Sequence, residues 1–235
     1  MRLTLDHVIL RAADPAATLA ELADRAGAPV LAHVEEVGGL ASGIVRAGAI
    51  DIEVLRIGAE PPPHPLGYGL GFTADVPLLG AVAELRERGF PCSPTARATA
   101  DGRKWSAVHV HGLLPDPFPV PASTKRRAAV EAVGSVLARI PAVSKAATRK
   151  AGSSMVVVTD YEFDADAWRA KAGEGPDVIA VEVGTGGHDW SRFPLEPGPL
   201  QLHHNGPAGI RRIVFEGDAE AFRLGDVAFE FSSAA

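Results

Sequence analysis

Apolar and polar residues follow two different periods near the start of the chain, and these predict a strand that leads into a helix. The apolar run that begins at Leu3 has the composition of a short buried strand. Asp14 and Pro15 follow it, and they favour a helix start because Asp caps the first turn and Pro fits the first helical position. Apolar residues then recur at helical spacing, namely Leu19, Leu22, Ala23 and Ala26. We therefore predict a helix over residues 15–26, which Gly27 ends.

Three more strands are predicted directly after this helix. Residues 29–37 and 40–47 are rich in strand-forming residues, and Gly38-Gly39 between them indicates a tight hairpin. Residues 50–57 alternate strictly, so apolar Ile50, Ile52 and Val54 share one face while Asp51 and Glu53 share the other. The first 58 residues therefore read as one βαβββ module.

A second module with the same order of elements follows a proline-rich linker at residues 59–65. It contains a predicted strand at 69–74, a helix that starts near Asp75 and ends at Gly89, and strands at 104–111 and 154–160. The two helices carry similar sequences at 19–25 and 82–88, which indicates an internal repeat of about 60 residues. We assign residues 66–121 and 153–164 to this second module.

Two further regions depart from the repeat. Residues 122–152 are basic and helical in spacing, with a break at Pro141, and we interpret them as a helical insertion. We expect its basic face to be solvated, and the alternative is that it contacts an anionic substrate or phosphate. Residues 165–235 form a C-terminal extension with predicted strands at 178–183 and 209–215. In this extension Glu230 lies five residues after Gly225, as Glu53 lies five residues after Gly48. The extension is therefore a candidate for a truncated third module.

Composition and charge exclude several classes of partner. The 235 residues are 46% hydrophobic and 22% charged, with a formal net charge of −6, which gives no reason to expect binding to nucleic acid or to an anionic membrane. The single cysteine, Cys92, allows no internal disulfide, and no apolar stretch has the length of a signal peptide. We expect a cytoplasmic protein, monomer or homodimer, whose partner is a small molecule.

His7 and Glu53 are the clearest candidates for chemistry, because they lie on two strands that can share one sheet. An imidazole and a carboxylate suit a divalent ion such as Zn²⁺, Ni²⁺, Mn²⁺, Fe²⁺ or Co²⁺. Two protein ligands are too few, and Asp160 or Glu162 at the end of the predicted strand at 154–160 could supply a third. The alternative is that His7 and Glu53 are ordinary polar residues with local partners.

Several short motifs resemble the vicinal oxygen chelate superfamily, in particular its glyoxalase-like branch. They are Asp6-His7-Val8, Asp14-Pro15, Ile52-Glu53-Val54, Gly71-Phe72, Gly89-Phe90-Pro91, the run from Asp101 to Trp105, and the run from His204 to Ile210. The resemblance implies an α+β fold in which paired βαβββ modules form a curved, cup-shaped mixed sheet with flanking helices. It also implies metal ligands on the first and last strands of the modules, where His7 and Glu53 fall.

The resemblance leaves two functions open. One is a metal-dependent enzyme of the isomerase, lyase or dioxygenase type, which acts on a small oxygenated substrate in a cup lined by Trp105 and His109. The other is a metal-free protein of the same fold that binds or sequesters a small molecule. The second module has no His, Gln or Glu near Tyr68, where the superfamily pattern places a metal ligand. The ligand set is therefore incomplete, and it favours the metalloenzyme only slightly.

Overall fold

The first 58 residues of the chain form the predicted βαβββ module. The computed structural model describes residues 1–37, 40–58, 61–115 and 154–233, and the predicted insertion at 122–152 lies outside the described residues. The elements of this module are β1 (Leu3–Arg11), α1 (Pro15–Ala26), β2 (Val30–Val37), β3 (Leu40–Ala47) and β4 (Ile50–Arg56). The Asp14 side chain accepts a hydrogen bond from the Ala17 backbone N–H, and Gly27 ends α1 with a φ of 63°. The capping signals in the sequence therefore act as predicted.

The second module follows the same plan, with β5 (Leu66–Ala74), α2 (Leu78–Glu87), β6 (Ala96–Ala100), β7 (Arg103–His109) and β8 (Met155–Tyr161). Sequence analysis did not predict β6, which pairs with β7 through a turn at Asp101 and Gly102. Both turn residues have positive φ, 49° and 71°, as a two-residue hairpin turn requires. An Asp-Gly pair is a hairpin signal, so β6 was readable from the turn rather than from its own exposed residues.

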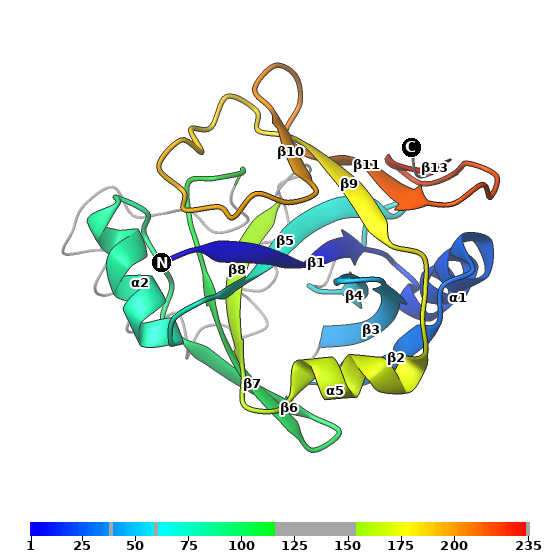
Figure 1. Ribbon diagram of the computed structural model, residues 1–235, viewed down its shortest axis with the longest axis horizontal. Helices are drawn as coiled ribbons and strands as arrows, with labels where there is room; N and C mark the ends of the chain where they lie inside the picture. Colours follow the sequence, from blue (N-terminus) through cyan, green and yellow to red (C-terminus); the bar gives the residue numbers. More distant parts are fainter. Residues whose placement is uncertain (38–39, 59–60, 116–153, 234–235) are drawn as a thin grey trace.

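The two modules join into one eight-stranded mixed sheet in the order β2-β3-β4-β1-β5-β8-β7-β6. In each module the first strand is parallel to the last, and the two first strands, β1 and β5, pair antiparallel at the centre. The sheet curves around β1, with α1 and α2 at opposite ends of the view and a short helix, α5 (Ala165–Arg169), below it (Figure 1). This confirms the α+β fold with paired βαβββ modules and a curved sheet.

The C-terminal extension forms a second, five-stranded sheet above the first one in Figure 1. After α5 and the short 3₁₀ turn η1 (Ala170–Ala172) come β9 (Val178–Gly184), β10 (Leu200–His203), β11 (Gly209–Glu216), β12 (Phe222–Leu224) and β13 (Val227–Ser232). Their order is β10-β9-β11-β13-β12, with β9 antiparallel to β11 and β11 parallel to β13. The same pattern of directions joins β4, β1, β5, β8 and β7 in the first sheet.

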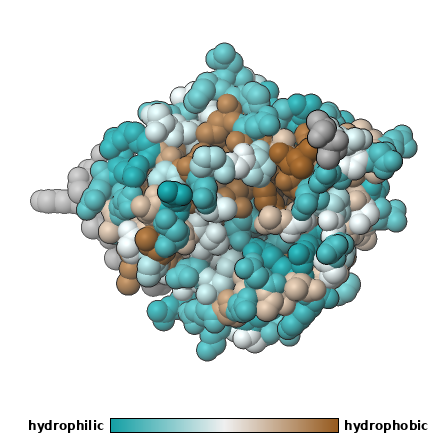
Figure 2. Space-filling view, viewed as in Figure 1, coloured by the Kyte–Doolittle hydropathy of each residue, from teal (hydrophilic) through white to brown (hydrophobic). Residues whose placement is uncertain are grey.

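One continuous apolar core joins both sheets to the helices. On β4, Ile50, Ile52 and Val54 are at most 3% exposed and belong to this core, as their alternation predicts. Figure 2 shows further apolar side chains gathered in the upper half of the face that it presents. A cavity of about 230 Å³ lies on the core side of β1, between Leu5 and the loop that ends at Leu200. Among the described residues, no helix combines the length and the apolar character that crossing a membrane requires.

Candidate active site

His7 is positioned by an irregularity in β1. The register between β1 and β5 shifts between Leu5 and His7, so Asp6 is an extra residue without a partner on β5. Such a bulge re-aims side chains, and here the Asp6 Oδ2 atom lies 2.7 Å from His7 Nδ1. Gly71 pairs with His7 across the strands, and a Cβ atom at Gly71 would lie 2.0 Å from His7 Cε1. The imidazole therefore lies flat over β5, in space that only a glycine leaves.

Glu53 faces His7 from the neighbouring strand β4. His7 Nε2 lies 3.8 Å from Glu53 Oε2, which is longer than a hydrogen bond. The other carboxylate oxygen of Glu53 accepts a hydrogen bond from the Ser42 hydroxyl on β3. The His7 and Glu53 side chains are 12% and 19% exposed, so solvent or a ligand reaches both. The strand pairing that the sequence predicted thus brings these two residues together.

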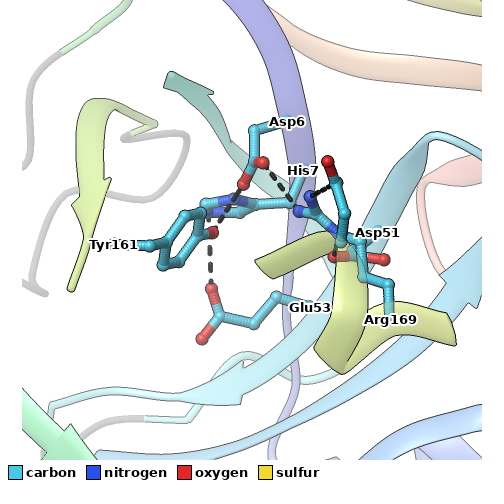
Figure 3. A network of polar contacts seen from close by, with 7 residues as sticks. Asp6, His7, Asp51, Glu53, Tyr161 and Arg169 are labelled. Atoms are coloured by element: carbon cyan, nitrogen blue, oxygen red, sulfur yellow. Dashed lines mark hydrogen bonds and ion pairs between the residues drawn. The ribbon is translucent and has the colours of Figure 1, made fainter. Parts of the chain in front are cut away.

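Arg169 and Tyr161 complete the network around Asp6 (Figure 3). The Arg169 guanidinium, at the end of α5, donates from Nη2 to Asp6 Oδ1 and from Nε to Asp51 Oδ2, both at 2.7 Å. The Tyr161 hydroxyl, at the end of β8, donates to Asp6 Oδ2 at 2.6 Å. Asp6 therefore receives hydrogen bonds on both oxygens, and its orientation toward His7 Nδ1 is fixed.

Burial and these contacts move the pKa values of the network in opposite directions. Burial disfavours the charged form of Asp6, but His7, Arg169 and Tyr161 outweigh burial and hold the pKa of Asp6 well below its ordinary value. Burial also opposes the imidazolium of His7, yet Asp6, Glu53 and Asp51 raise the pKa of His7 above 6.5. Burial raises the pKa of Asp51 despite Arg169, and burial together with Asp6 raises the pKa of Tyr161. A protonated His7 between carboxylates is the state that this network stabilises.

The other predicted site residues lie on β7, on β8 or directly after β8. Asp160 pairs with Ser106 and is exposed, and Glu162 after the end of β8 is also exposed. Because side chains alternate along a strand, Tyr161 rather than either of these acidic residues points toward Asp6. On β7, Trp105 pairs with Tyr161 and His109 pairs with Val157, so both lie on the face that carries the network. His109 is buried and its ring stacks on His111 at 4.5 Å.

The residues of the network do not make up a complete metal site. His7 Nε2 and Glu53 are two donors, while His7 Nδ1 already bonds to Asp6, and Arg169 joins Asp6 to Asp51. The ring of His7 fills the space at Gly71, so β5 supplies no third donor. In the part of the chain that the structure describes, no group of three or more His, Cys, Asp or Glu residues has an arrangement that could hold a metal ion.

Sequence analysis did not identify Asp6, Asp51, Tyr161 or Arg169 as members of the site. Asp51 could have been predicted from the sequence, because its alternation with Glu53 places both side chains on one face. The bulge that turns Asp6 toward His7 leaves no signal in the sequence. Arg169 comes from the extension, 118 residues away from Asp51 along the chain, and its position depends on tertiary structure alone.

Comparisons with solved structures identify the fold. A hypothetical protein from Staphylococcus aureus aligns with 100% of both chains at 8% sequence identity and a TM-score of 0.64. A variant of 4-hydroxymandelate synthase from Streptomyces coelicolor aligns over 92% of this chain and 71% of its own, at 13% identity and a TM-score of 0.50. Methylmalonyl-CoA epimerase from Mycobacterium tuberculosis aligns over 66% of this chain and 85% of its own, at 14% identity and a TM-score of 0.39. No protein-family model and no curated protein sequence matches the chain.

The strand order and the two matches with TM-scores of 0.64 and 0.50 agree on one architecture. Paired βαβββ modules whose first strands meet at the centre of a curved sheet are the arrangement that the sequence motifs imply. The alignment of the whole chain with the S. aureus structure extends the likeness to the C-terminal sheet. The chain has the fold of the vicinal oxygen chelate superfamily, of which 4-hydroxymandelate synthase is a member.

Proposed function

We propose that the protein is an enzyme that moves a proton at a carbon atom beside the carbonyl group of a small oxygenated molecule. The observation that carries the proposal is the pairing of His7 and Glu53, with 3.8 Å between Nε2 and Oε2 and with Nδ1 held by Asp6 at 2.7 Å. Substrate atoms can approach both groups from their exposed side, because the two side chains are 12% and 19% exposed. Isomerases and lyases that form an enolate need such a pair, one group to take the proton and one to stabilise the oxygen.

Glu53 is the base in this scheme. Its carboxylate takes the proton from carbon, the C–H electron pair forms the C=C bond of the enolate, and the carbonyl oxygen gains the negative charge. His7 donates a hydrogen bond from Nε2–H to that oxygen, because Asp6 and the surrounding carboxylates favour the imidazolium. Return of the proton from Glu53 to the same or a neighbouring carbon completes an isomerisation. Among the described residues, His7 and Glu53 are the two donors that a metal ion could use here, and the scheme requires no metal ion.

Exchange of deuterium into carbonyl compounds tests this function. The protein is incubated in D₂O with a panel of aliphatic, aromatic and anionic carbonyl compounds, and proton NMR follows the C–H signal beside each carbonyl group. We expect faster loss of signal than in buffer for at least one compound. Glu53→Gln and His7→Gln should slow this exchange about 100-fold or more, the usual range for removing a general base or acid.

A matched control tests whether the loss of any carboxylate from this sheet, rather than the loss of Glu53, slows the exchange. Glu36 on β2 is exposed and pairs with Arg56, so Glu36→Gln should leave the exchange unchanged. Equal exchange in the Glu53→Gln and parent proteins would overturn the assignment of the base. Binding of a panel compound without any exchange would instead favour the metal-free binding protein, which uses the same cup but performs no chemistry.

A further inference from the structure

The charge around His7 and Glu53 limits the substrates that can bind there. Three carboxylates meet in this network, those of Asp6, Asp51 and Glu53, against one guanidinium and one imidazole. Both sides of the Arg169 guanidinium are occupied by Asp6 and Asp51. Among these five groups carboxylates outnumber cations whether His7 is charged or neutral, so a carboxylate or phosphate placed at His7 and Glu53 would meet repulsion from the network.

Two other arginines of the same face, Arg103 and Arg11, are engaged or buried. Arg103 lies over the Trp168 ring at 4.3 Å and pairs with Asp101. Arg11 is 5% exposed and lies over the Tyr68 ring at 5.7 Å. Neither presents an open guanidinium to a bound anion. Arg46 on β3 is partly exposed, but it lies directly across from Asp51 on β4, so a carboxylate opposes this cation as well.

Apolar side chains border the pair on the same face. Ile9 pairs with Glu53 across β1 and β4, and it belongs to a cluster with Leu55, Tyr68 and Val157. Met155, half-buried on β8, packs against this cluster. The four residues of the cluster are at most 8% exposed, so Met155 is the apolar side chain of this group that a substrate at His7 can contact.

Trp105 adds an aromatic surface to this face. It lies opposite Tyr161, and its ring is partly exposed. The other two tryptophans are engaged, since the Trp190 N–H donates to the Leu113 carbonyl at 2.7 Å and Trp168 contacts Phe163 and Arg103. Within the described residues, Trp105 makes no hydrogen bond through its side chain and no ring contact. A partly exposed indole that makes no such contact with the rest of the described chain is a suitable surface for a flat apolar group.

We propose that the substrate is an uncharged carbonyl compound with an aromatic group, which lies on Trp105 while the carbonyl group lies between His7 and Glu53. This inference rests on the proposed function, because it takes the pair as the reacting centre. In this inference Trp105 determines which substrates bind well, and the carboxylates around His7 repel acidic substrates.

Three probes test the inference in the intact protein, namely 1-phenylpropan-2-one, butan-2-one and phenylpyruvate. Deuterium exchange should be at least tenfold more efficient for 1-phenylpropan-2-one than for the other two after subtraction of the buffer rate. Trp105→Ala should lower the efficiency for the aromatic ketone at least tenfold, Trp105→Phe should restore most of it, and butan-2-one should be unaffected. Equal efficiency for all three probes, or a preference for phenylpyruvate, would overturn the inference.

Binding measured without turnover keeps the two proposals separate. Calorimetry with 1-phenylpropan-2-one should give an affinity that falls at least fivefold in Trp105→Ala, and Glu53→Gln should strengthen phenylpyruvate binding at least threefold because it removes one repelling charge. Binding with these properties but without exchange would contradict proton transfer and leave the substrate class standing. Exchange that depends on Glu53 but not on Trp105 would contradict the substrate class and leave proton transfer standing.

Discussion

In each sheet two carboxylates are joined by one arginine, and we call this arrangement an arginine bridge. The two arginine bridges differ mainly in burial. In the first sheet Arg169 joins Asp6 to Asp51 and is 11% exposed, and in the second Arg212 joins Glu182 to Glu230 and is 38% exposed. A histidine lies beside each bridge, since His203 Nε2 is 3.9 Å from Glu182 Oε2. His203, however, is 47% exposed, and its contact with Glu182 is too long for a hydrogen bond.

The comparison shows that burial changes how an arginine bridge affects the pKa values of its carboxylates. Hydrogen bonds from Arg212 lower the pKa of Glu182, as in an ordinary surface ion pair. In the first sheet burial instead raises the pKa of Asp51, while the contacts of Asp6 overcome burial and lower its pKa. Only the buried bridge fixes a histidine, and we infer that only the buried bridge supports chemistry.

Removal of Arg169 should have the largest effect on folding. Arg169→Met leaves Asp6 and Asp51 buried without their cation, so we expect a loss of about 3–5 kcal/mol in the free energy of unfolding. Denaturant unfolding monitored by circular dichroism measures this loss. Arg169→Lys should recover part of it, because a lysine can contact one carboxylate but lacks the second donor of the fork. A loss as small as that of Arg212→Met would contradict the difference that burial makes.

A methyl group at Gly71 should displace the His7 ring. Its Cβ would lie 2.0 Å from His7 Cε1, so Gly71→Ala forces the ring or the strand to move and should cost about 1–3 kcal/mol of stability. We also expect loss of the deuterium exchange. Gly80→Ala on α2 is the control, because its nearest neighbour is 3.8 Å away and alanine favours a helix over glycine by about 0.5–1 kcal/mol. Unchanged exchange in Gly71→Ala would show that the ring position is not required.

The stability of the protein should depend on pH through His7. The pKa of His7 is raised in the folded protein, so the stabilisation is complete below the ordinary value of 6.5 and disappears as pH rises through the raised value. His7→Gln should therefore cost more stability at pH 5.5 than at pH 9, when both proteins are unfolded by denaturant at each pH. An equal cost at both pH values would contradict the raised pKa.

Removal of Arg212 should have the smallest effect. Its bridge is partly solvated, so Arg212→Met should cost at most about 1 kcal/mol. Added salt should reduce this cost further, because screening weakens exposed ion pairs more than buried ones. Unfolding in 0.1 M and 1 M sodium chloride compares the two arginine variants. If Arg212→Met lost as much unfolding free energy as Arg169→Met, burial would not explain the difference between the two arginine bridges.

Local patterns predicted most of the elements of the two modules. Asp14, Pro15 and Gly27 gave the ends of α1 exactly as capping chemistry requires, and alternation on β4 gave the buried and polar faces. Short strands with exposed residues, such as β6 and β10, lacked alternation of this kind, and only pairing with a neighbour defines them. Periodicity is a property of half-buried elements, so short strands with mostly exposed residues are the ones that it misses.

The site was predictable only where strand geometry alone determines it. His7 and Glu53 meet because β1 and β4 are parallel neighbours, which the module order implies. The rest of the network depends on a bulge at Asp6 and on the path of the chain between β8 and Arg169, and neither has a local signal. Metal binding by His7, Glu53, Asp160 or Glu162 stays a prediction, and the donors present near His7 do not favour it.

Nitrogen-15 NMR of the His7 ring tests most directly whether Asp6 holds the imidazole with Nε2 toward Glu53. Spectra of histidine-labelled protein, with His7 assigned by its loss in His7→Gln, report which ring nitrogen carries a proton. We predict a strongly hydrogen-bonded Nδ1–H in the parent protein, whose proton signal moves upfield in Asp6→Asn. A neutral ring protonated only at Nε2, or a His7 signal that Asp6→Asn does not change, would contradict the account.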